Sequence, residues 1–306
     1  MAVNTLRRTQ PDDGRCPWLR RIVLTLGPLE EWRGAGAGQI IRIESDGTPK
    51  NLKMTASVQR TIMGMPQPST ISIYNLARDT RDAIRGGLTK LTLEAGWGNM
   101  EMHKVFQGSV LSAVHERSGA DIVTRISALP GYGALIKGVS SRTFPEGLPV
   151  RDVVRELAKD LPGLTVAGTG IEGIPGAIHK GGWSFAGSTK DGLTQLANEY
   201  GFSWHVENGE FKAVGDKAAF GGFAKLNGND GGLISVVPTL TGPMQVQTGV
   251  KVKAIYIPGI TAGSSIQVES GVSPKLNGTY RVSKVSISLD THSEQWTMDI
   301  ESFTAG

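Results

Sequence analysis

The histidines of this 306-residue chain are the first residues to test for chemistry, because zinc binding and acid–base catalysis both draw on imidazole. They are His103, His115, His179, His205 and His292. Their spacing matches neither H-x-x-x-H nor H-E-x-x-H, and no cysteines or carboxylates cluster beside them. We therefore predict solvated histidines in loops and strands and no metal site. His205 follows Trp204 on an alternating strand, so we expect it to face away from the core that Trp204 enters.

A second candidate is the segment 168–173, which reads Gly-Thr-Gly-Ile-Glu-Gly and is a literal G-x-G-x-x-G. A dinucleotide site needs these glycines to open a helix whose N-terminus faces the pyrophosphate. Pro175 and Gly176 follow at once and should prevent that helix. Residues 34–38, Gly-Ala-Gly-Ala-Gly, lack the lysine and serine of a phosphate-binding loop. We interpret both stretches as loops and predict no cofactor.

Paired carboxylates would be needed for glycoside hydrolysis, and tryptophans could stack on the sugar. The candidate carboxylates are Glu94, Glu101, Glu116, Asp121 and Asp191, and the candidate aromatic residues are Trp97, Trp183, Trp204 and Trp296. Nothing in the sequence brings two carboxylates together, and each tryptophan fits the core of a strand. We predict no catalytic residue and a protein that is not an enzyme. The sequence does not identify interface residues.

Composition narrows the class of protein further. The net charge is +4, from 32 basic and 28 acidic residues spread thinly, which indicates weak basicity without a stripe that would read nucleic acid. No run approaches the roughly 20 apolar residues of a membrane span, and residues 1–8 lack the apolar centre of a signal peptide. We expect no membrane anchor and synthesis in a cytoplasm. The single cysteine, Cys16, excludes an intramolecular disulfide and is expected to be a passive thiol.

The elements that must carry these residues are mostly strands. The 41 glycines are about twice the number expected at the average usage of roughly 7%, and they punctuate alternating runs such as 52–60. Helical periodicity predicts helices over 149–161 and 189–200, with Ser188 as N-cap and Asp191 as part of an imperfect capping box. Asn208-Gly209 predicts the turn of a hairpin, and no helix is predicted after residue 216.

These elements predict a mainly β, β-rich α+β fold in four parts. Residues 1–17 are expected to be a flexible arm, 18–137 a first tube-like β-barrel, 138–215 an inserted small α/β domain, and 216–306 a second tube-like β-barrel. Residues 216–232 are expected to be a glycine-rich connection. In the last part, strands at 279–289 and 295–303 are expected to form a hairpin with Trp296, Met298 and Ile300 on one face.

The order of several motifs resembles the baseplate hub proteins of contractile-tail bacteriophages, which are related to the N-terminal part of type VI secretion spike proteins. The likeness covers roughly residues 20–303. The motifs that carry it in the first barrel are Arg60-Thr-Ile-Met-Gly-Met-Pro and the residues up to Leu76, Thr80–Ile84, Leu93–Trp97 and Val105–Val110. In the insert and second barrel they are Ser188–Trp204, Gly278–Val282 and Trp296–Ile300. Each motif alone is loose and apolar.

The resemblance implies a homotrimer in which each copy contributes two similar barrels, so that the ring matches a six-fold tail tube on one side and a three-fold spike on the other. The expected partners are the tail tube or tube-initiator protein, the spike, the tape-measure protein and other baseplate proteins, with transient, non-specific passage of DNA through the channel. The expected place is the baseplate of the virion, after synthesis in the cytoplasm of a bacterial host. Two alternatives stay open: a distal tail ring or secretion-spike component, and a cell-wall hydrolase.

Overall fold

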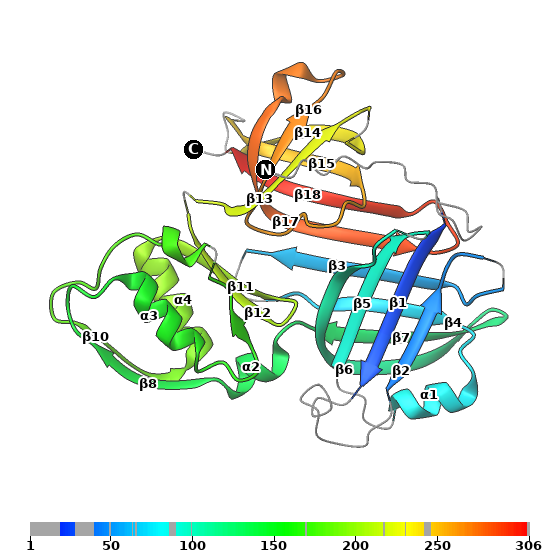
Figure 1. Ribbon diagram of the computed structural model, residues 1–306, viewed down its shortest axis with the longest axis horizontal. Coiled ribbons are helices and arrows are strands. Elements are labelled where there is room, and N and C mark those ends of the chain that lie inside the picture. The colour runs from blue at the N-terminus through cyan, green and yellow to red at the C-terminus, as the bar shows by residue number, and fades with distance from the viewer. Residues whose placement is uncertain are drawn as a thin grey trace.

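The computed structural model describes residues 19–27, 40–48, 50–62, 64, 66–85, 90–98, 100–168, 170–216, 218–229, 231–241 and 246–304. The predicted arm at 1–17, with Cys16, and the loop at 34–38 lie outside these residues. Over the described part the chain is mainly β, which confirms the predicted fold class. Two β-units and a smaller α/β insert, which lies between them in sequence, make up the molecule (Figure 1).

The first β-unit is a curled antiparallel sheet with the strand order β2-β1-β5-β6-β7-β4-β3. Apolar and polar residues alternate along most strands; on β4, for example, Ile71 and Ile73 are buried while Ser72 between them is not. Helix α1 packs Ala83 and Ile84 against this core. The elements are β1 (Arg20–Gly27), β2 (Ile41–Ser45), β3 (Met54–Thr61), β4 (Ser69–Tyr74), α1 (Arg78–Arg85), β5 (Lys90–Trp97), β6 (His103–Ser118) and β7 (Asp121–Leu129).

The second β-unit has the strand order β13-β16-β17-β18-β15-β14, and its pairs are antiparallel except for β13 with β16. As predicted, Trp296, Met298 and Ile300 share one buried face of β18. The elements are β13 (Phe220–Asn227), β14 (Leu233–Thr241), β15 (Val246–Ile255), β16 (Ser264–Glu269), the 3₁₀ turn η3 (Pro274–Leu276), β17 (Gly278–Asp290) and β18 (Trp296–Thr304).

Two predictions for this part of the chain are wrong. The expected glycine-rich connection at 216–232 contains strand β13, which pairs in parallel with β16 and buries Leu226. The register shifts between Phe220 and Phe223, so the two intervening glycines interrupt the alternation that would have revealed the strand. The predicted absence of helix fails for the single turn η3, which Pro274 begins.

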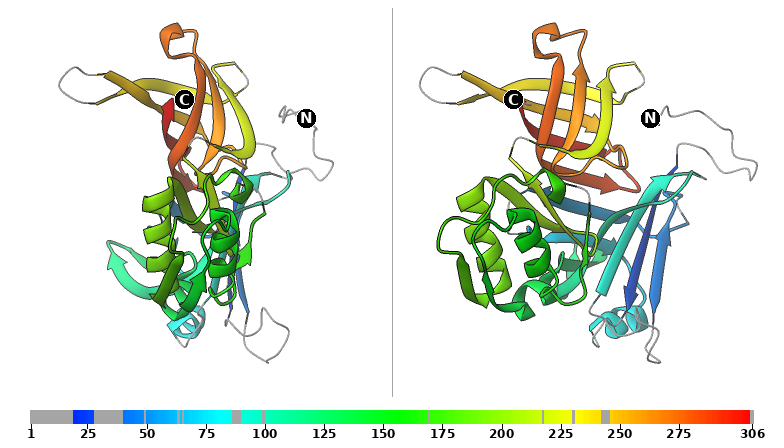
Figure 2. Two further views of the ribbon diagram at one scale, coloured as in Figure 1. Left: turned by 90° about the vertical axis from the view of Figure 1, so that its left-hand side faces the viewer. Right: turned by 60° about the vertical axis from the view of Figure 1, so that its left-hand side comes forward.

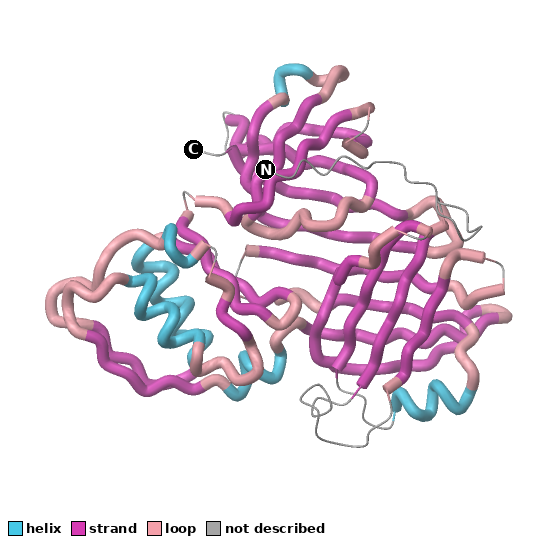
Figure 3. The backbone as a smooth tube through the Cα atoms, viewed as in Figure 1, coloured by secondary structure: helices cyan, strands magenta, loops and turns pink. Residues whose placement is uncertain are grey.

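The insert gathers most of the helix in the described residues, as Figure 3 shows. Helix α4 has the predicted bounds, and Gly201 ends it with a φ of 68°. Asn208 and Gly209, with φ of 52° and 84°, make the predicted hairpin turn. The elements are α2 (Tyr132–Lys137), β8 (Val139–Phe144), α3 (Val150–Ala158), β9 (Thr165–Val166), the 3₁₀ turn η2 (Ile171–Gly173), β10 (Trp183–Ser188), α4 (Thr189–Tyr200), β11 (Phe202–Glu207) and β12 (Glu210–Gly215).

The predicted capping box at the start of α4 is wrong in its chemistry. Ser188 is the N-cap residue, but its side chain makes no capping hydrogen bond. It is also the last residue of β10, where it pairs with Val139 of β8. The sheet therefore fixes the backbone at this helix start, and Asp191 is exposed on the first turn.

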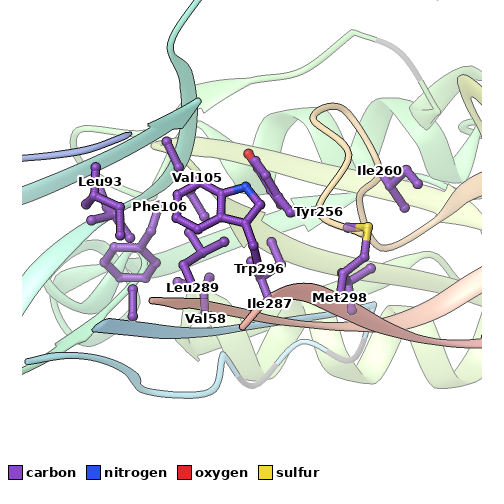
Figure 4. Packing of buried hydrophobic residues seen from close by; sticks show 14 of the residues in the cluster. Val58, Leu93, Val105, Phe106, Tyr256, Ile260, Ile287, Leu289, Trp296 and Met298 are labelled. Atoms are coloured by element: carbon purple, nitrogen blue, oxygen red, sulfur yellow. The ribbon is translucent and has the colours of Figure 1, made fainter. Parts of the chain in front are cut away.

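One hydrophobic core runs beneath both β-units, and the insert has a separate one. The shared core is continuous because β17 pairs with β3, which places Val58 of the first unit beside Ile287 and Leu289 of the second (Figure 4). In the insert, α3 and α4 cover a core that also takes in Ala134 and Leu135 of α2. The views in Figure 2 show the second unit above the first unit and the insert. The domain boundaries stay predictions.

Candidate functional site

The joint between the two β-units is an antiparallel pairing of β3 with β17. Its register runs from Thr55 opposite Asp290 to Thr61 opposite Lys284. Just beyond this range, the Ile62 N–H donates to the Ser283 carbonyl at 3.1 Å. The two strands lie side by side across the middle of the molecule (Figure 1), so the joint turns two sheets into one.

The second β-unit repeats the pairing of the first. The hairpin β3/β4 corresponds to β14/β15, and the later pairs β4:β7, β5:β6 and β6:β7 correspond to β15:β18, β16:β17 and β17:β18. The irregularities correspond too, because the long strands β6 and β17 each shift register near the middle, at Leu111 and at Ser283. The strands β3 to β7 and β14 to β18 are therefore an internal structural repeat.

This repeat leaves two strand edges unpaired in the described part of the chain. On β17, residues 278–282 lie in the half that pairs with β16, and residues 284–290 pair with β3. On β6, residues 103–109 pair with β5, whereas residues 112–118 have only β7 beside them. Strand β14 likewise has only β15 beside it. The run β14-β15-β18-β17-β3-β4-β7-β6 thus has a free edge at each end.

On its central strands, the face of this run that points away from the core is polar. On the central strands β17 and β3, pairs such as Ser286 with Gln59 and Ser288 with Ser57 lie on it. Toward the β14 end, Lys251 and Glu301 form an ion pair of 3.7 Å across β15 and β18. Further polar or charged residues point outward on β3, β4, β7, β15, β17 and β18. They are Thr55, Thr61, Thr70, Ser72, Arg125, Ser127, Lys253, Lys284, Thr297 and Asp299.

A buried ionic cluster fastens the insert beneath the joint. Arg60 of β3 lies 3.0 Å from the Glu207 carboxylate of β11, and their side chains are 10% and 6% exposed. The Arg60 guanidinium also donates to the carbonyl of Val105 at 2.5 Å and of Ile260 at 3.1 Å. One arginine therefore contacts the first unit, the insert and the second unit.

Glu207 is held by several further groups. The Lys212 ammonium lies 2.9 Å from its carboxylate, His205 Nε2 lies 3.8 Å from it, and the Thr261 hydroxyl donates to it. Burial alone would raise the pKa of Glu207, but Arg60, His205 and Lys212 together hold that pKa well below its usual range. Gly64, between β3 and β4, also lies against the insert, because a Cβ there would lie 2.6 Å from the Trp204 ring.

Comparison with known proteins then decides the family. The sequence matches the family described as baseplate hub gp41 over residues 40–302, which covers the insert and both β-units apart from β1 and the end of β18. This chain belongs to the baseplate hub gp41 family. Among curated proteins, none matches the sequence.

Solved tail proteins share the fold of this baseplate hub chain. It is similar to a tail protein from Neisseria meningitidis MC58, with a TM-score of 0.62, 10% identity and coverage of 94% of this chain and 98% of that one. It is also similar to a 43 kDa tail protein of prophage MuSo2 from Shewanella oneidensis, with a TM-score of 0.59, 11% identity and coverage of 92% of this chain and 96% of that one. The E. coli c3393 protein, a component of the type VI secretion system, has a similar fold, with a TM-score of 0.54, 8% identity and coverage of 82% of this chain and 73% of that one.

The histidines do not gather into a site in the hub structure. Four of the five hold separate positions: His103 begins β6, His115 contacts the Thr124 hydroxyl at 3.1 Å, His179 stacks on Tyr200, and His292 lies beside Thr291. His205 faces away from the insert core as expected, but the prediction that it is solvated is wrong. It is buried against Glu207 because the joint covers that side of β11.

The other candidate residues serve packing or local bonding. The end of the segment 168–173 is the 3₁₀ turn η2, whose Ile171 enters the insert core, and no α-helix follows it directly. Trp183, Trp204 and Trp296 are buried, and Trp97 packs on Trp296 with ring centroids 5.5 Å apart. The carboxylates stay separate: Glu116 pairs with Arg125, Asp121 accepts from Asn75, and Glu94, Glu101 and Asp191 lie on β5, in a loop and on α4.

In the described residues, no three or more His, Cys, Asp or Glu side chains form a group that could hold a metal ion, and no helix there is long and apolar enough to cross a membrane. Sequence reasoning quoted Arg60 only as part of a motif and did not single out Glu207. A local signal for the pair exists in hindsight, since Glu207 and His205 alternate on a strand whose other face carries Trp204.

Proposed function

We propose that three copies of this baseplate hub subunit form a pseudo-six-fold ring that joins the hexameric tail tube to the trimeric spike. The observation that carries the proposal is the internal repeat: each chain holds two β-units with the same pairing, joined into one sheet. Three such chains present six similar units around a three-fold axis. A ring of this kind can meet a six-fold partner with its repeated strands and a three-fold partner with its inserts.

The polar face of the joined sheet is the proposed wall of the channel. Serine, threonine, glutamine and charges of both signs lie on its outward positions, including the Lys251–Glu301 pair. On the central strands β3 and β17 this surface offers no large apolar side chains to hold a passing protein, and it has no basic stripe to hold a passing phosphate backbone. It suits the transient passage of DNA and of the tape-measure protein.

The remaining surfaces are assigned by the same proposal. The tail tube or tube-initiator protein binds one rim of the ring, the spike binds the opposite rim, and other baseplate proteins bind the outside. The protein works through these contacts in the virion and not as an enzyme. In support, the most strongly perturbed carboxylate in the described residues, Glu207, is used inside the fold to join its parts.

Two measurements test the ring. Light scattering of the purified chain should give three times the mass of one chain, and imaging of intact tails should show one such ring between tube and spike. A chain that stays monomeric and is absent from the particle overturns the proposal. A ring of six copies would instead indicate a distal tail ring. Hydrolysis of peptidoglycan that is lost on replacing Glu116 or Asp121 would indicate a cell-wall hydrolase.

A further inference from the structure

We infer that the free half of β6, residues 112–118, pairs antiparallel with β14 of a second copy of this chain, in the register that β17 and β3 use within one chain. The inference rests on the proposed ring and adds the strands and the register that close it. Its starting point is that β6 corresponds to β17, and β14 to β3, in the internal repeat.

The register follows from equivalent residues. The register shifts align Leu111 with Ser283, which makes Glu116 equivalent to Ser288. In the other strand, Ala56 lies opposite Ile71, and Val236 lies opposite Val252, at corresponding places beside β7 and β18. Val237 is therefore equivalent to Ser57.

Because Ser288 lies opposite Ser57 in the joint, Glu116 should lie opposite Val237 of the next copy. By the same alignment, Val114 should lie opposite Thr239, and Ala113 opposite Leu240.

Side chains on the two free edges fit a contact between copies. Val114 on β6 and Val237 and Leu240 on β14 are 46%, 51% and 48% exposed, although each lies on a strand of the main sheet. Pairing of the two edges would place Val114 two residue pairs along the strand from Val237, on the same face, and would cover Leu240 with the neighbouring chain. This would bury apolar surface and satisfy backbone groups that lack a strand neighbour in the described residues.

Pro238 on β14 supports the assignment of this strand as an edge. Proline has no N–H to donate, and within sheets it is confined to edge strands, strand starts and bulges. It lies opposite Val250 in the middle of the β14–β15 pairing. The equivalent residue in the joint is Val58, opposite Ile287, so the inferred contact has one donor fewer than the joint.

The contact is heterologous, since each copy uses β6 toward one neighbour and β14 toward the other. Heterologous contacts close into rings when the rotation between copies allows it. The in-chain joint shows the rotation that one such pairing produces between two β-units. Repeating it between copies gives every unit in the ring the same neighbours.

Disulfide cross-linking tests the register directly. The Ile62–Ser283 hydrogen bond marks a bonded pair, so, counting along the alternating pairs, Ser57 and Ser288 form a non-bonded pair. Such pairs have Cα atoms about 4.5 Å apart, within the roughly 4.4–6.8 Å that a disulfide accepts. In a Cys16→Ser background, the test variant is Glu116→Cys/Val237→Cys, and Ser57→Cys/Ser288→Cys is the in-chain control.

Oxidation of the test variant should give covalent dimers and trimers and no larger species on a non-reducing gel. Each single variant should stay uncross-linked, and a mixture of the two should give dimers only. The pair Ser112→Cys/Val237→Cys, displaced by four residues or about 13 Å along the strand, should not link. Both positions of the test pair are on exposed strand edges, so these variants should fold.

The outcomes separate this inference from the proposed ring. A trimer by light scattering with no 116–237 disulfide, while the in-chain control links, overturns the inferred contact and leaves the ring standing. Cross-linked species larger than a trimer support the strand pairing and overturn the three-fold ring. A chain that is monomeric at every concentration and gives no cross-link overturns both.

Discussion

The paired half of β17 and the free half of β6 occupy equivalent places in the two β-units, yet their core-facing residues differ. On β17 they are Val285, Ile287 and Leu289, which are fully buried in the shared core. On β6 the equivalents are Ala113, His115 and Arg117, which are half-buried or exposed. An edge that is covered within its own chain tolerates large aliphatic side chains. On the free half of β6, the core-facing positions instead take small or polar side chains.

The equivalent strands β3 and β14 differ at the position that anchors the insert. Arg60 of β3 binds Glu207 of the insert, whereas its equivalent on β14 is the exposed Leu240. The same strand position thus anchors an insert in one repeat and presents an apolar side chain to solvent in the other. The two repeats therefore share one backbone pattern, but this position fastens the insert in one of them and lies on the proposed contact edge in the other.

Replacing Arg60 should give the largest effect, because it leaves the Glu207 carboxylate buried without its main partner. Arg60→Leu, which copies the residue found on β14, should lower the free energy of unfolding by about 3–5 kcal/mol. Urea unfolding followed by tryptophan fluorescence measures this. The matched change Leu240→Arg, at an exposed position, should stay within about 0.5 kcal/mol. Equal losses in the two variants would show that the repeats do not differ in this way.

A double variant tests the cause. Arg60→Leu/Glu207→Leu removes both buried charges, so it should recover much of the stability that Arg60→Leu loses. If the double variant is as unstable as the single one, the loss comes from the carbonyls of Val105 and Ile260 that Arg60 also binds.

The inner faces of the two long strands give the next prediction. Ile287→Ala empties part of the shared core and should cost about 3 kcal/mol in the free energy of unfolding, within the usual range of roughly 2–5 kcal/mol for such changes. His115→Ala, at the equivalent place on β6, removes a contact with Thr124 and should cost at most about 1 kcal/mol. The comparison fails if both variants lose the same stability in the isolated chain.

Acid should weaken the joint through Glu207. Its folded pKa is depressed, so its stabilising effect is complete above the unfolded pKa of about 4.3 and is lost as the pH falls through the folded pKa. The Arg142 guanidinium, which donates to Asp160, lowers the pKa of that carboxyl as well. Burial would raise the pKa of Asp290, but the His292 N–H and the Lys53 ammonium lower it. Unfolding free energy measured from pH 6 to pH 3 should fall less steeply in Glu207→Gln than in the unmodified chain. If the unfolding free energy falls with pH equally steeply in both proteins, Glu207 does not contribute to the acid destabilisation.

Much of the fold could be predicted because its signals are local. Helix α4 has the predicted bounds, and Asn208-Gly209 makes the predicted turn, since helical period and turn residues act over a few positions. Strand β13 was missed because Gly221 and Gly222 break its alternation.

The joint and the cluster around Glu207 could not be predicted, because no local sequence pattern indicates them. Lys284 and Thr61 pair across more than two hundred residues. The alternation at Trp204 showed which way His205 points but not that β3 would cover it. Burial of Glu207 depends on Arg60 arriving from another unit, so the carboxylate looked like any other on a strand. Long-range pairing decided which polar residues became buried.

Proline on the free edge should give the smallest change in the isolated chain and the clearest change in how copies associate. Pro238→Val restores the residue type of the equivalent Val58 and adds a backbone donor to β14. Because the position is exposed on an edge strand, unfolding of the monomer should shift by less than about 1 kcal/mol. Association should strengthen, since the added N–H completes the ladder that β6 of a neighbouring copy would form.

Sedimentation over a range of concentrations measures this change in association, with Ser235→Val on the same strand as the control for added apolar surface. If Pro238→Val and Ser235→Val associate equally, the missing donor does not limit the contact. If Pro238→Val weakens association, then β14 meets its neighbour through side chains alone, and the likeness between the free edges and the in-chain joint ends at the backbone.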